Sequence, residues 1–351
     1  MYKNLIISLV TLFSSFSYAN PTLGLPPLPI PADNPQTVEK IKLGQLLFND
    51  SRFSDDGTVS CANCHHSDKA FTDGLAVAKG INQQTGVRNA PTVINSAFYE
   101  TLFLDGRAKS LEEQALGPFL NPVEHGLTDF NKIIEVIQND IQYIQLFYQV
   151  FNIQAEEITI NHVAKTIASF ERTLVSGNSL FDQYYFGRDH SKLTESEARG
   201  MRVFRRKGNC ANCHEISWDN ALFMDNKFYN IGIGFERIKD QVDNIISSLK
   251  QGESIESLEL SPEQVSELGR FNVTRIISDI GKFKTPTIRN INLTAPYMHD
   301  GSIKTLEEVV DYYDKGGISS RFTDAAIFPL NFTEQEKIDL VAFMKALTGS
   351  M

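Results

Sequence analysis

The stretch CANCH occurs twice in this chain, at residues 61–65 and again at residues 210–214. Each copy has the form C-x-x-C-H, which is the pattern of c-type haem attachment. On one helical turn both thiols can add to the porphyrin vinyl groups, and the histidine that follows then lies under the iron as an axial ligand. The sequence therefore predicts two covalently bound haem c groups, with His65 and His214 as iron ligands. The attachment residues are Cys61, Cys64, Cys210 and Cys213, which are all the cysteines of the chain.

Other uses of paired cysteines fit this spacing less well. A zinc knuckle would need two further ligands near each pair, and neither pair has a second C-x-x-C partner. A thioredoxin-like redox pair would not require the histidine. Exported proteins usually spend cysteines on disulfides, but two complete haem motifs outweigh that expectation.

The first nineteen residues have the features of a cleaved secretory signal. Lys3 supplies the positive start, residues 5–13 (LIISLVTLF) are apolar, and Ala19 is a small residue suited to signal peptidase. The apolar stretch is far shorter than the ~18 residues that cross a bilayer, so an uncleaved anchor is the less favoured alternative. We expect residues 1–19 to be a signal peptide and the mature protein to be periplasmic, with no membrane span.

The charge balance restricts the class of partner. The 351 residues include 33 Lys and Arg against 43 Asp and Glu, a formal charge of −10. No Lys- or Arg-rich run occurs, so nucleic acid is excluded as a partner. A basic protein partner stays open because opposite net charges accelerate encounter, although net charge does not locate a docking surface.

The distance between the haem motifs predicts the domain organisation. They begin 149 positions apart, which indicates one haem per domain. We expect a mainly α fold of two cytochrome c-like haem domains with few short strands. The predicted units are a Pro-rich arm at 20–36, an N-terminal haem domain at 37–180 and a C-terminal haem domain at 181–351.

Local patterns predict where several helices begin. Capping boxes of the S/T-x-x-E/Q type start at Ser110, Thr194, Ser261, Thr305 and Thr333. Apolar spacing predicts a helix over 156–174, and a helix over 194–207 would deliver the second haem motif. The last capping box opens an amphipathic helix whose apolar face contains Ile338, Val341, Met344 and Leu347. Residues 226–284 have a weak pattern, which indicates short strands or a loop insertion.

Several blocks outside the haem motifs carry a resemblance to a known family. They are NAPT at 89–92, DGRA at 105–108, FKTPTIRN at 283–290 and LTAPYMHDG at 293–301. In this order and spacing they resemble the bacterial di-haem cytochrome c peroxidases and their MauG-like relatives, over essentially the whole mature chain. The resemblance implies a peroxide-binding haem on His65 and an electron-relay haem on His214.

The resemblance also implies roles for single residues. Glu124 matches the distal acid/base, with Gln114 and Pro118 in the same pocket. One positioned carboxylate can take a proton from one peroxide oxygen and return it to the other. The alternative interpretation of Glu124 is a surface glutamate in a loop. A calcium ion between the haem domains would be held, largely through carbonyl oxygens, by Asn89, Thr294 and Pro296.

Two positions that determine haem ligation depart from the peroxidase pattern. The removable distal histidine of the peroxidases falls near Ile81, and residues 67–104 contain no His or Met. We therefore expect an open first iron that needs no reductive activation. The distal ligand of the second haem falls on Tyr313, as in MauG-like enzymes, and a phenolate would stabilise ferric iron. Tyr312 and Met298 are alternative ligands.

A third departure concerns the path between the haems. The tryptophan that lies there in both subfamilies is Leu104 in this chain. The one tryptophan, Trp218, lies four residues after His214 and is no evident substitute. Hopping through an oxidised indole is therefore excluded at that position.

These observations favour an exported peroxidase. It would reduce hydrogen peroxide to water with electrons from a small c-type cytochrome or cupredoxin. A second hypothesis is a MauG-like enzyme, which uses peroxide and high-valent haems to oxidise residues of a partner protein; Tyr313 favours it and Leu104 weakens it. A plain electron carrier is disfavoured, because a carrier needs two six-coordinate irons. Dimers occur in the family, so a homodimer stays open, although the sequence reveals no dimer face.

Overall fold

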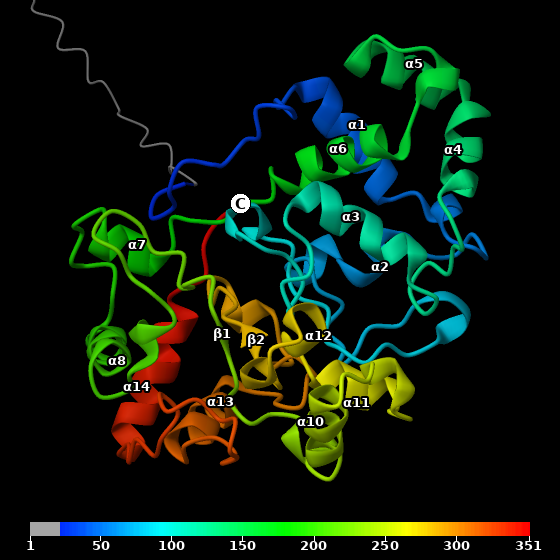
Figure 1. Ribbon diagram of the computed structural model, residues 1–351. Coiled ribbons are helices and arrows are strands. Elements are labelled where there is room, and N and C mark those ends of the chain that lie inside the picture. The colour runs from blue at the N-terminus through cyan, green and yellow to red at the C-terminus, as the bar shows by residue number, and fades with distance from the viewer. Residues whose placement is uncertain (1–21) are drawn as a thin grey trace, which may run out of the picture.

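The computed structural model describes residues 22–351 and is mainly helical (Figure 1). The predicted signal peptide lies outside the described residues. The helices of the N-terminal half are α1 Val38–Phe48, α2 Cys61–Cys64, α3 Leu111–Leu120, α4 Asn131–Gln138, α5 Ile141–Phe151 and α6 Ile160–Glu171. Those that follow are α7 Leu180–Tyr185, α8 Glu195–Arg205, α9 Phe235–Ile238, α10 Val242–Lys250, α11 Pro262–Glu267, α12 Phe271–Thr274, α13 Leu306–Asp314 and α14 Glu334–Lys345.

The described residues form one small sheet. Its strands, β1 Phe228–Tyr229 and β2 Phe283–Lys284, pair antiparallel. The predicted mainly α fold with few short strands is thus confirmed. None of the helices within 22–351 has the length and apolarity of a membrane-spanning segment.

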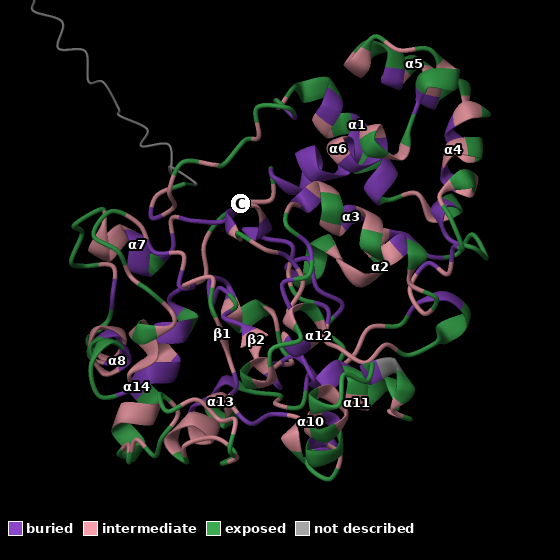
Figure 2. Ribbon diagram, viewed as in Figure 1, coloured by how far each residue is buried: buried purple, intermediate pink, exposed green. Residues whose placement is uncertain are grey.

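Each half is built on a pair of tightly packed helices. In α1, Gly44 lies so close to α6 that a Cβ atom would be 1.9 Å from the Thr166 carbonyl oxygen. In α8, Gly200 lies equally close to α14, with 1.9 Å to the Asp339 carbonyl oxygen. One core cluster takes its buried residues from 43–170 and another from 181–347, and Figure 2 shows both as buried bands along these helix pairs.

The two halves contain an internal repeat that the haem motifs and the family blocks do not by themselves reveal. With a constant offset of 195 positions, residues 88–118 align with 283–313, and nine of the 31 pairs are identical. The haem motifs are offset by only 149 positions. The stretch between the haem motif and the repeated segment is therefore 46 residues longer in the C-terminal half than in the N-terminal half.

The repeat is also structural. His299 accepts a hydrogen bond at its carbonyl from the Asn89 backbone N–H, and Leu104 accepts one from the Lys284 N–H, both at 2.8 Å. Asn89 and Lys284 are a repeat pair, and so are Leu104 and His299. Such reciprocal contacts are what a two-fold relation produces. The two halves therefore meet across a local pseudo-two-fold axis.

The segment 226–284 contains the short strands that the sequence predicted, but the rest of it is more helical than expected. Residues 226–284 contain the four short helices α9–α12, with a core that includes Ile238, Ile245, Leu268 and Phe271. Strand is limited to β1 and β2 near the ends of the segment. Helices of four to nine residues are too short to show sustained periodicity, which explains the weak pattern.

The helix starts predicted from the five capping sequences are confirmed, with one difference in detail. Thr194, Ser261, Thr305 and Thr333 form capping boxes. At Ser110 the second contact of the capping box differs. The Glu113 carboxylate accepts a hydrogen bond from the Lys109 backbone N–H at 2.7 Å, in place of the N–H of Ser110.

The predicted apolar face of the last helix is wrong at one residue. Ile338 is 60% exposed, whereas Val341, Met344 and Leu347 are buried as expected. The buried stripe begins instead at Leu340, because α14 is oriented by its contact with α8.

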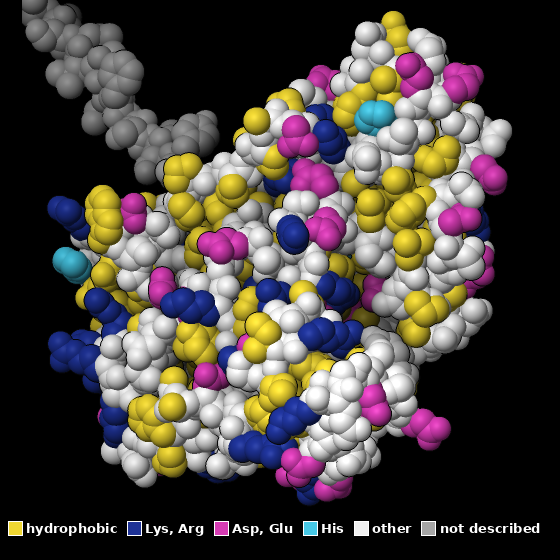
Figure 3. Space-filling view, in the orientation of Figure 1, with side chains coloured by type: hydrophobic (Ala, Val, Ile, Leu, Met, Phe, Trp, Pro, Cys, Tyr) yellow, Lys and Arg dark blue, Asp and Glu magenta, His cyan; other side chains and the backbone are white. Residues whose placement is uncertain are grey.

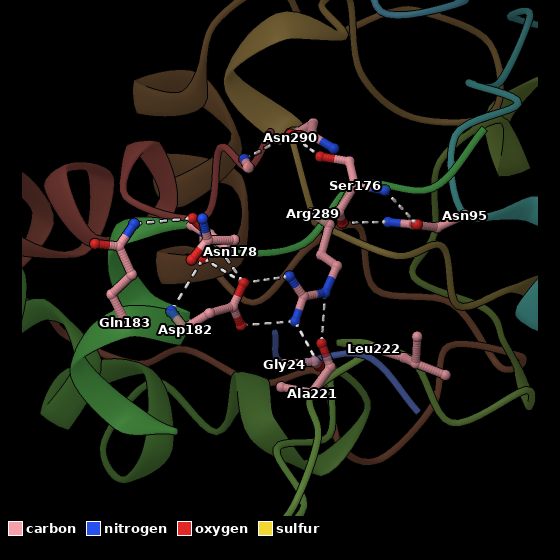
Figure 4. A network of polar contacts seen from close by, with 12 residues as sticks. Gly24, Asn95, Ser176, Asn178, Asp182, Gln183, Ala221, Leu222, Arg289 and Asn290 are labelled. Carbon is pink, nitrogen blue, oxygen red and sulfur yellow. Dashed lines mark hydrogen bonds and ion pairs between the residues drawn. The ribbon is translucent and has the colours of Figure 1, made fainter. Parts of the chain in front are cut away.

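Residues 22–36 form an arm that fastens the two halves together. Near its start, the Gly24 carbonyl accepts a hydrogen bond from Arg289 at 2.8 Å (Figure 4). Near its end, the buried Asn34 side chain donates to Glu112 at 2.7 Å. The arm thus contacts the C-terminal half and then the N-terminal half.

Candidate active site

A cavity of about 1290 Å³ lies between the two halves and receives both predicted haem motifs. Cys64 and His65 line it from one half, and Cys210, Cys213 and His214 line it from the other. Each motif forms a helical turn, with the histidine N–H bonded to the first cysteine carbonyl at 3.0 Å for His65 and 2.9 Å for His214. This local geometry is the one that haem attachment requires.

Both histidines are oriented for iron ligation. Nδ1 of His65 lies 3.0 Å from the Phe71 carbonyl oxygen, and Nδ1 of His214 lies 2.8 Å from that of Phe223. An Nδ1–H donated to a carbonyl leaves Nε2 free as the metal ligand. Burial lowers the pKa of both rings, which keeps them in the neutral form that binds a metal. The residues present therefore fit two haems.

The predicted peroxide-handling residues all line this cavity. Gln114 and Pro118 from α3 and Glu124 from the turn after it line the cavity together with His65. Glu124 accepts a 2.6 Å hydrogen bond from the Asn121 side chain. Burial raises the pKa of Glu124, and the positive charge of Arg107 opposes that rise.

Asn121 and Arg107 were not singled out from the sequence. Both line the cavity, and Arg107 is held by Asp105 through a 2.9 Å ion pair. Nothing in the local sequence around Asn121 marks it, because its relation to Glu124 depends on how the turn folds.

Ile81, near which the resemblance places the family's removable histidine, is an apolar residue. Ile81 is buried, and its N–H donates to the Glu124 carbonyl at 3.0 Å. Apart from His65 and His214, His299 is the one histidine among the described residues that lines the cavity. Its Nε2 is bonded to Glu267 at 2.7 Å. His125 instead packs on Phe119, inside the N-terminal core.

The tyrosine pair near the second haem site is resolved by its hydrogen bonds. Tyr313 lines the cavity, and none of the described residues hydrogen-bonds its hydroxyl. Tyr312 points elsewhere: its hydroxyl donates to the Ile231 carbonyl at 2.6 Å and accepts from the Ile318 N–H at 3.2 Å. The geometry favours Tyr313 over Tyr312, and Met298 also lines the cavity.

Leu104, Tyr99 and Lys284 also line the cavity. The Tyr99 hydroxyl accepts a 2.7 Å hydrogen bond from the Thr287 N–H. Lys284 Nζ lies 3.7 Å from the centroid of the Tyr99 ring. Trp218 is 88% exposed, which agrees with its dismissal as a substitute. Neither Tyr99 nor Lys284 was singled out from the sequence, although the internal repeat pairs them with the proposed calcium ligands Thr294 and Asn89.

The three predicted calcium ligands line the same cavity. The Asn89 amide donates to the Leu75 carbonyl at 2.8 Å, which leaves its Oδ1 free to ligate. None of the described residues donates a hydrogen bond to the carbonyl oxygens of Thr294 or Pro296. Free amide and carbonyl oxygens are the ligands that calcium prefers, so these residues fit the ion.

Comparison with known proteins identifies the family. Residues 38–190 match a family model described as di-haem cytochrome c peroxidase. The chain is 36% identical to cytochrome-c peroxidase IdrP1 of Pseudomonas sp. (strain SCT), over 99% of this chain and 91% of that protein. The chain belongs to the di-haem cytochrome c peroxidase family. It is 35% identical to methylamine utilization protein MauG of Methylorubrum extorquens, over 91% of this chain and 81% of that protein.

Solved structures agree with this assignment. A MauG-like protein associated with microbial copper homeostasis matches with a TM-score of 0.77 and 34% identity, over 93% of this chain and 94% of that one. The di-haem peroxidase BthA of Burkholderia thailandensis shares the fold, with a TM-score of 0.70 and 21% identity.

Family membership confirms the resemblance inferred from the sequence. This di-haem peroxidase is an oxidoreductase of the peroxide-using class, and two haems are its cofactors. The roles of Glu124, Gln114, Tyr313 and the calcium ligands stay predictions, as does the division into domains at residue 180.

Proposed function

We propose that the protein is a periplasmic di-haem peroxidase that reduces hydrogen peroxide to water with electrons from a small redox protein. Two haem c groups would be attached through Cys61, Cys64, Cys210 and Cys213. The observation that carries the proposal is the grouping of Gln114, Pro118 and Glu124 with His65 in one cavity. Calcium would bind at Asn89, Thr294 and Pro296.

The chain's own contribution to the reaction is proton transfer. Reduction of one peroxide to two waters consumes two electrons and two protons. The haems, when bound, supply irons that accept electrons one at a time from the donor. Glu124 takes a proton from one peroxide oxygen and returns it to the other, and Asn121 holds the carboxylate in place. Ile81 supports an open first site, because its side chain cannot ligate iron.

Local charge favours a donor with an acidic face. The last turn of α8, which leads into the second haem motif, exposes Arg202 and Arg205, and the C-cap residue Arg206 is exposed beside them. Figure 3 shows Lys and Arg side chains along the edge of the molecule where this helix lies. Docking depends on the facing patches rather than on net charge. A basic donor, suggested by the formal charge of −10, is therefore the less favoured choice.

A MauG-like activity on a partner protein is the second candidate. Tyr313 favours it, because its free hydroxyl lies in the cavity near Cys210, and a phenolate ligand would lower the potential of the second haem. Relatives with both kinds of name match this chain at similar identity.

Two measurements test these functions. The oxidised haem-loaded protein is expected to give one high-spin and one low-spin ferric signal in electron paramagnetic resonance. Tyr313→Phe should change the low-spin signal alone, and Tyr312→Phe is the matched control. Two low-spin signals would contradict the open first site. Steady turnover of peroxide with a reduced small cytochrome or cupredoxin would support the peroxidase, whereas peroxide consumption without donor turnover would favour the MauG-like activity.

A further inference from the structure

The internal repeat relates the calcium ligands to a second set of residues. At the offset of 195 positions, Asn89 corresponds to Lys284, Thr294 to Tyr99, and Pro296 to Thr101. Two of the three proposed ligands act through backbone carbonyls, which every residue has. The decisive exchange is therefore at the first position, where an amide oxygen in one set is replaced by an ammonium in the other.

The Lys284 ammonium lies where the second set would hold a cation. Its Nζ donates to the carbonyl of Thr101, the counterpart of Pro296, and lies 3.7 Å from the centroid of the Tyr99 ring. The side chain is only 6% exposed. Burial lowers the pKa of Lys284 to about 7, and the Asp105 carboxylate opposes that shift. The carbonyl and the ring face add to the stabilisation of the charged form.

Both positions connect one half of the molecule to the other. Asn89 belongs to the N-terminal half, and Thr294 and Pro296 belong to the C-terminal half. In the second set, Lys284 belongs to the C-terminal half and Thr101 belongs to the N-terminal half. The backbones of Asn89 and Lys284 make the reciprocal 2.8 Å hydrogen bonds that define the pseudo-two-fold axis, so the two positions are equivalent in the fold as well as in the alignment.

We propose that Lys284 is the built-in cation of a second inter-half cation site, related by the repeat to the calcium site. Its ammonium links the halves on one side of the axis, as a calcium ion bound at Asn89, Thr294 and Pro296 would on the other. The identity of the first ion rests on the proposed function, but the assignment of Lys284 rests on its own contacts. The chain thus carries one site for an exchangeable cation and one whose cation is covalently part of the protein.

The test is to remove the built-in cation and restore the amide of its counterpart. Lys284→Asn should create a site for a divalent cation, whereas Lys284→Met, which has neither charge nor amide oxygen, should not. Calcium binding to the chelator-treated, haem-loaded protein is measured by equilibrium dialysis. We expect one bound calcium in the wild type and in Lys284→Met, and two in Lys284→Asn.

Further outcomes separate this proposal from the calcium site itself. If the wild type binds no calcium and Lys284→Asn binds one, the first site fails while the assignment of Lys284 stands. If folded Lys284→Asn binds no more calcium than the wild type, the assignment is overturned. Failure of Lys284→Asn to fold in medium containing calcium also overturns it, since the ion should replace the lost charge. If Lys284→Asn folds only when calcium is present, that result supports the assignment of Lys284.

Discussion

In the proposed function, peroxide turnover depends on the carboxyl group of Glu124. Glu124→Gln removes the proton acceptor and keeps the side-chain volume, so the turnover rate should fall about 10²–10⁴-fold. Burial raises the pKa of Glu124. As the pH is lowered, the wild-type rate should therefore begin to decline at a pH above the pKa of an ordinary glutamate. Steady-state rates over a pH series measure both effects.

The matched control for Glu124 is Glu100→Gln, which changes an exposed glutamate on the same half of the chain. Its turnover and pH profile should equal those of the wild type. An unchanged pH profile in Glu124→Gln would assign the acid limb to another group and remove Glu124 from the proton-transfer role.

Glu171 also lines the cavity, and its carboxyl group should affect the free energy of unfolding. It is 5% exposed, and its Oε2 has no hydrogen-bond partner. Burial raises its pKa from 4.5 to about 8. Between these values the unfolded chain is ionised at this residue while the folded chain keeps the proton. The free energy of unfolding should therefore fall as pH rises from about 4.5 to 8.

Glu171→Gln should remove this part of the pH dependence. Relative to the wild type, the variant should gain about 1–3 kcal/mol between pH 5 and pH 8, measured by urea unfolding of the haem-loaded protein. Glu156→Gln, at an exposed position, should show no such gain. A difference between Glu171→Gln and wild type that is the same at both pH values would mean that Glu171 is ionised in the folded protein.

At the level of elements, the two tight helix pairs depend on glycine. Gly44→Ala would place a Cβ 1.9 Å from the Thr166 carbonyl oxygen, so α1 and α6 would have to separate. We expect a loss of about 1–3 kcal/mol of unfolding free energy, and a similar loss for Gly200→Ala between α8 and α14. The control is Gln45→Ala, at the next and exposed position of α1. Equal stability of Gly44→Ala and Gln45→Ala would contradict the tight packing.

The elements also show what a sequence can and cannot reveal. The haem motifs and the boxes at Thr194 and Thr333 were predictable, because their chemistry is complete within four or five consecutive residues. The core of α9–α12 was not, because each helix is short and its partners lie elsewhere in the chain. Ile338 was placed wrongly for a related reason: the face that α14 buries is decided by α8.

The residues of the candidate site also divide into those that the sequence could predict and those that only the fold reveals. The resemblance brought Glu124, Gln114 and Tyr313 to attention, and the cavity contains all three. Hydrogen bonds that only a structure reveals then separated Tyr313 from Tyr312. Lys284 could have been found from the sequence, since its repeat partner is Asn89, but its contacts with Thr101 and Tyr99 required the fold.

At the scale of the whole molecule, a buried arginine of the C-terminal half, Arg289, connects the arm to that half. Arg289 is 1% exposed and makes two 2.8 Å contacts with the carboxylate of Asp182. It also donates to the Ala221 carbonyl at 2.7 Å and to the arm at Gly24 (Figure 4). The guanidinium thus holds together three segments that are distant in sequence.

Arg289→Met should cost far more stability than the loss of an exposed ion pair. It leaves the Asp182 charge buried without its partner, and breaking a buried pair in this way costs about 3–5 kcal/mol. Arg321→Met, which breaks the exposed pair with Asp243, should cost about 0–1 kcal/mol. Guanidinium unfolding of both variants measures the difference. The arm should also become accessible to protease near Gly24 in Arg289→Met alone. Equal losses in the two variants would mean that the arm is held by its contacts at Asn34 rather than by Arg289.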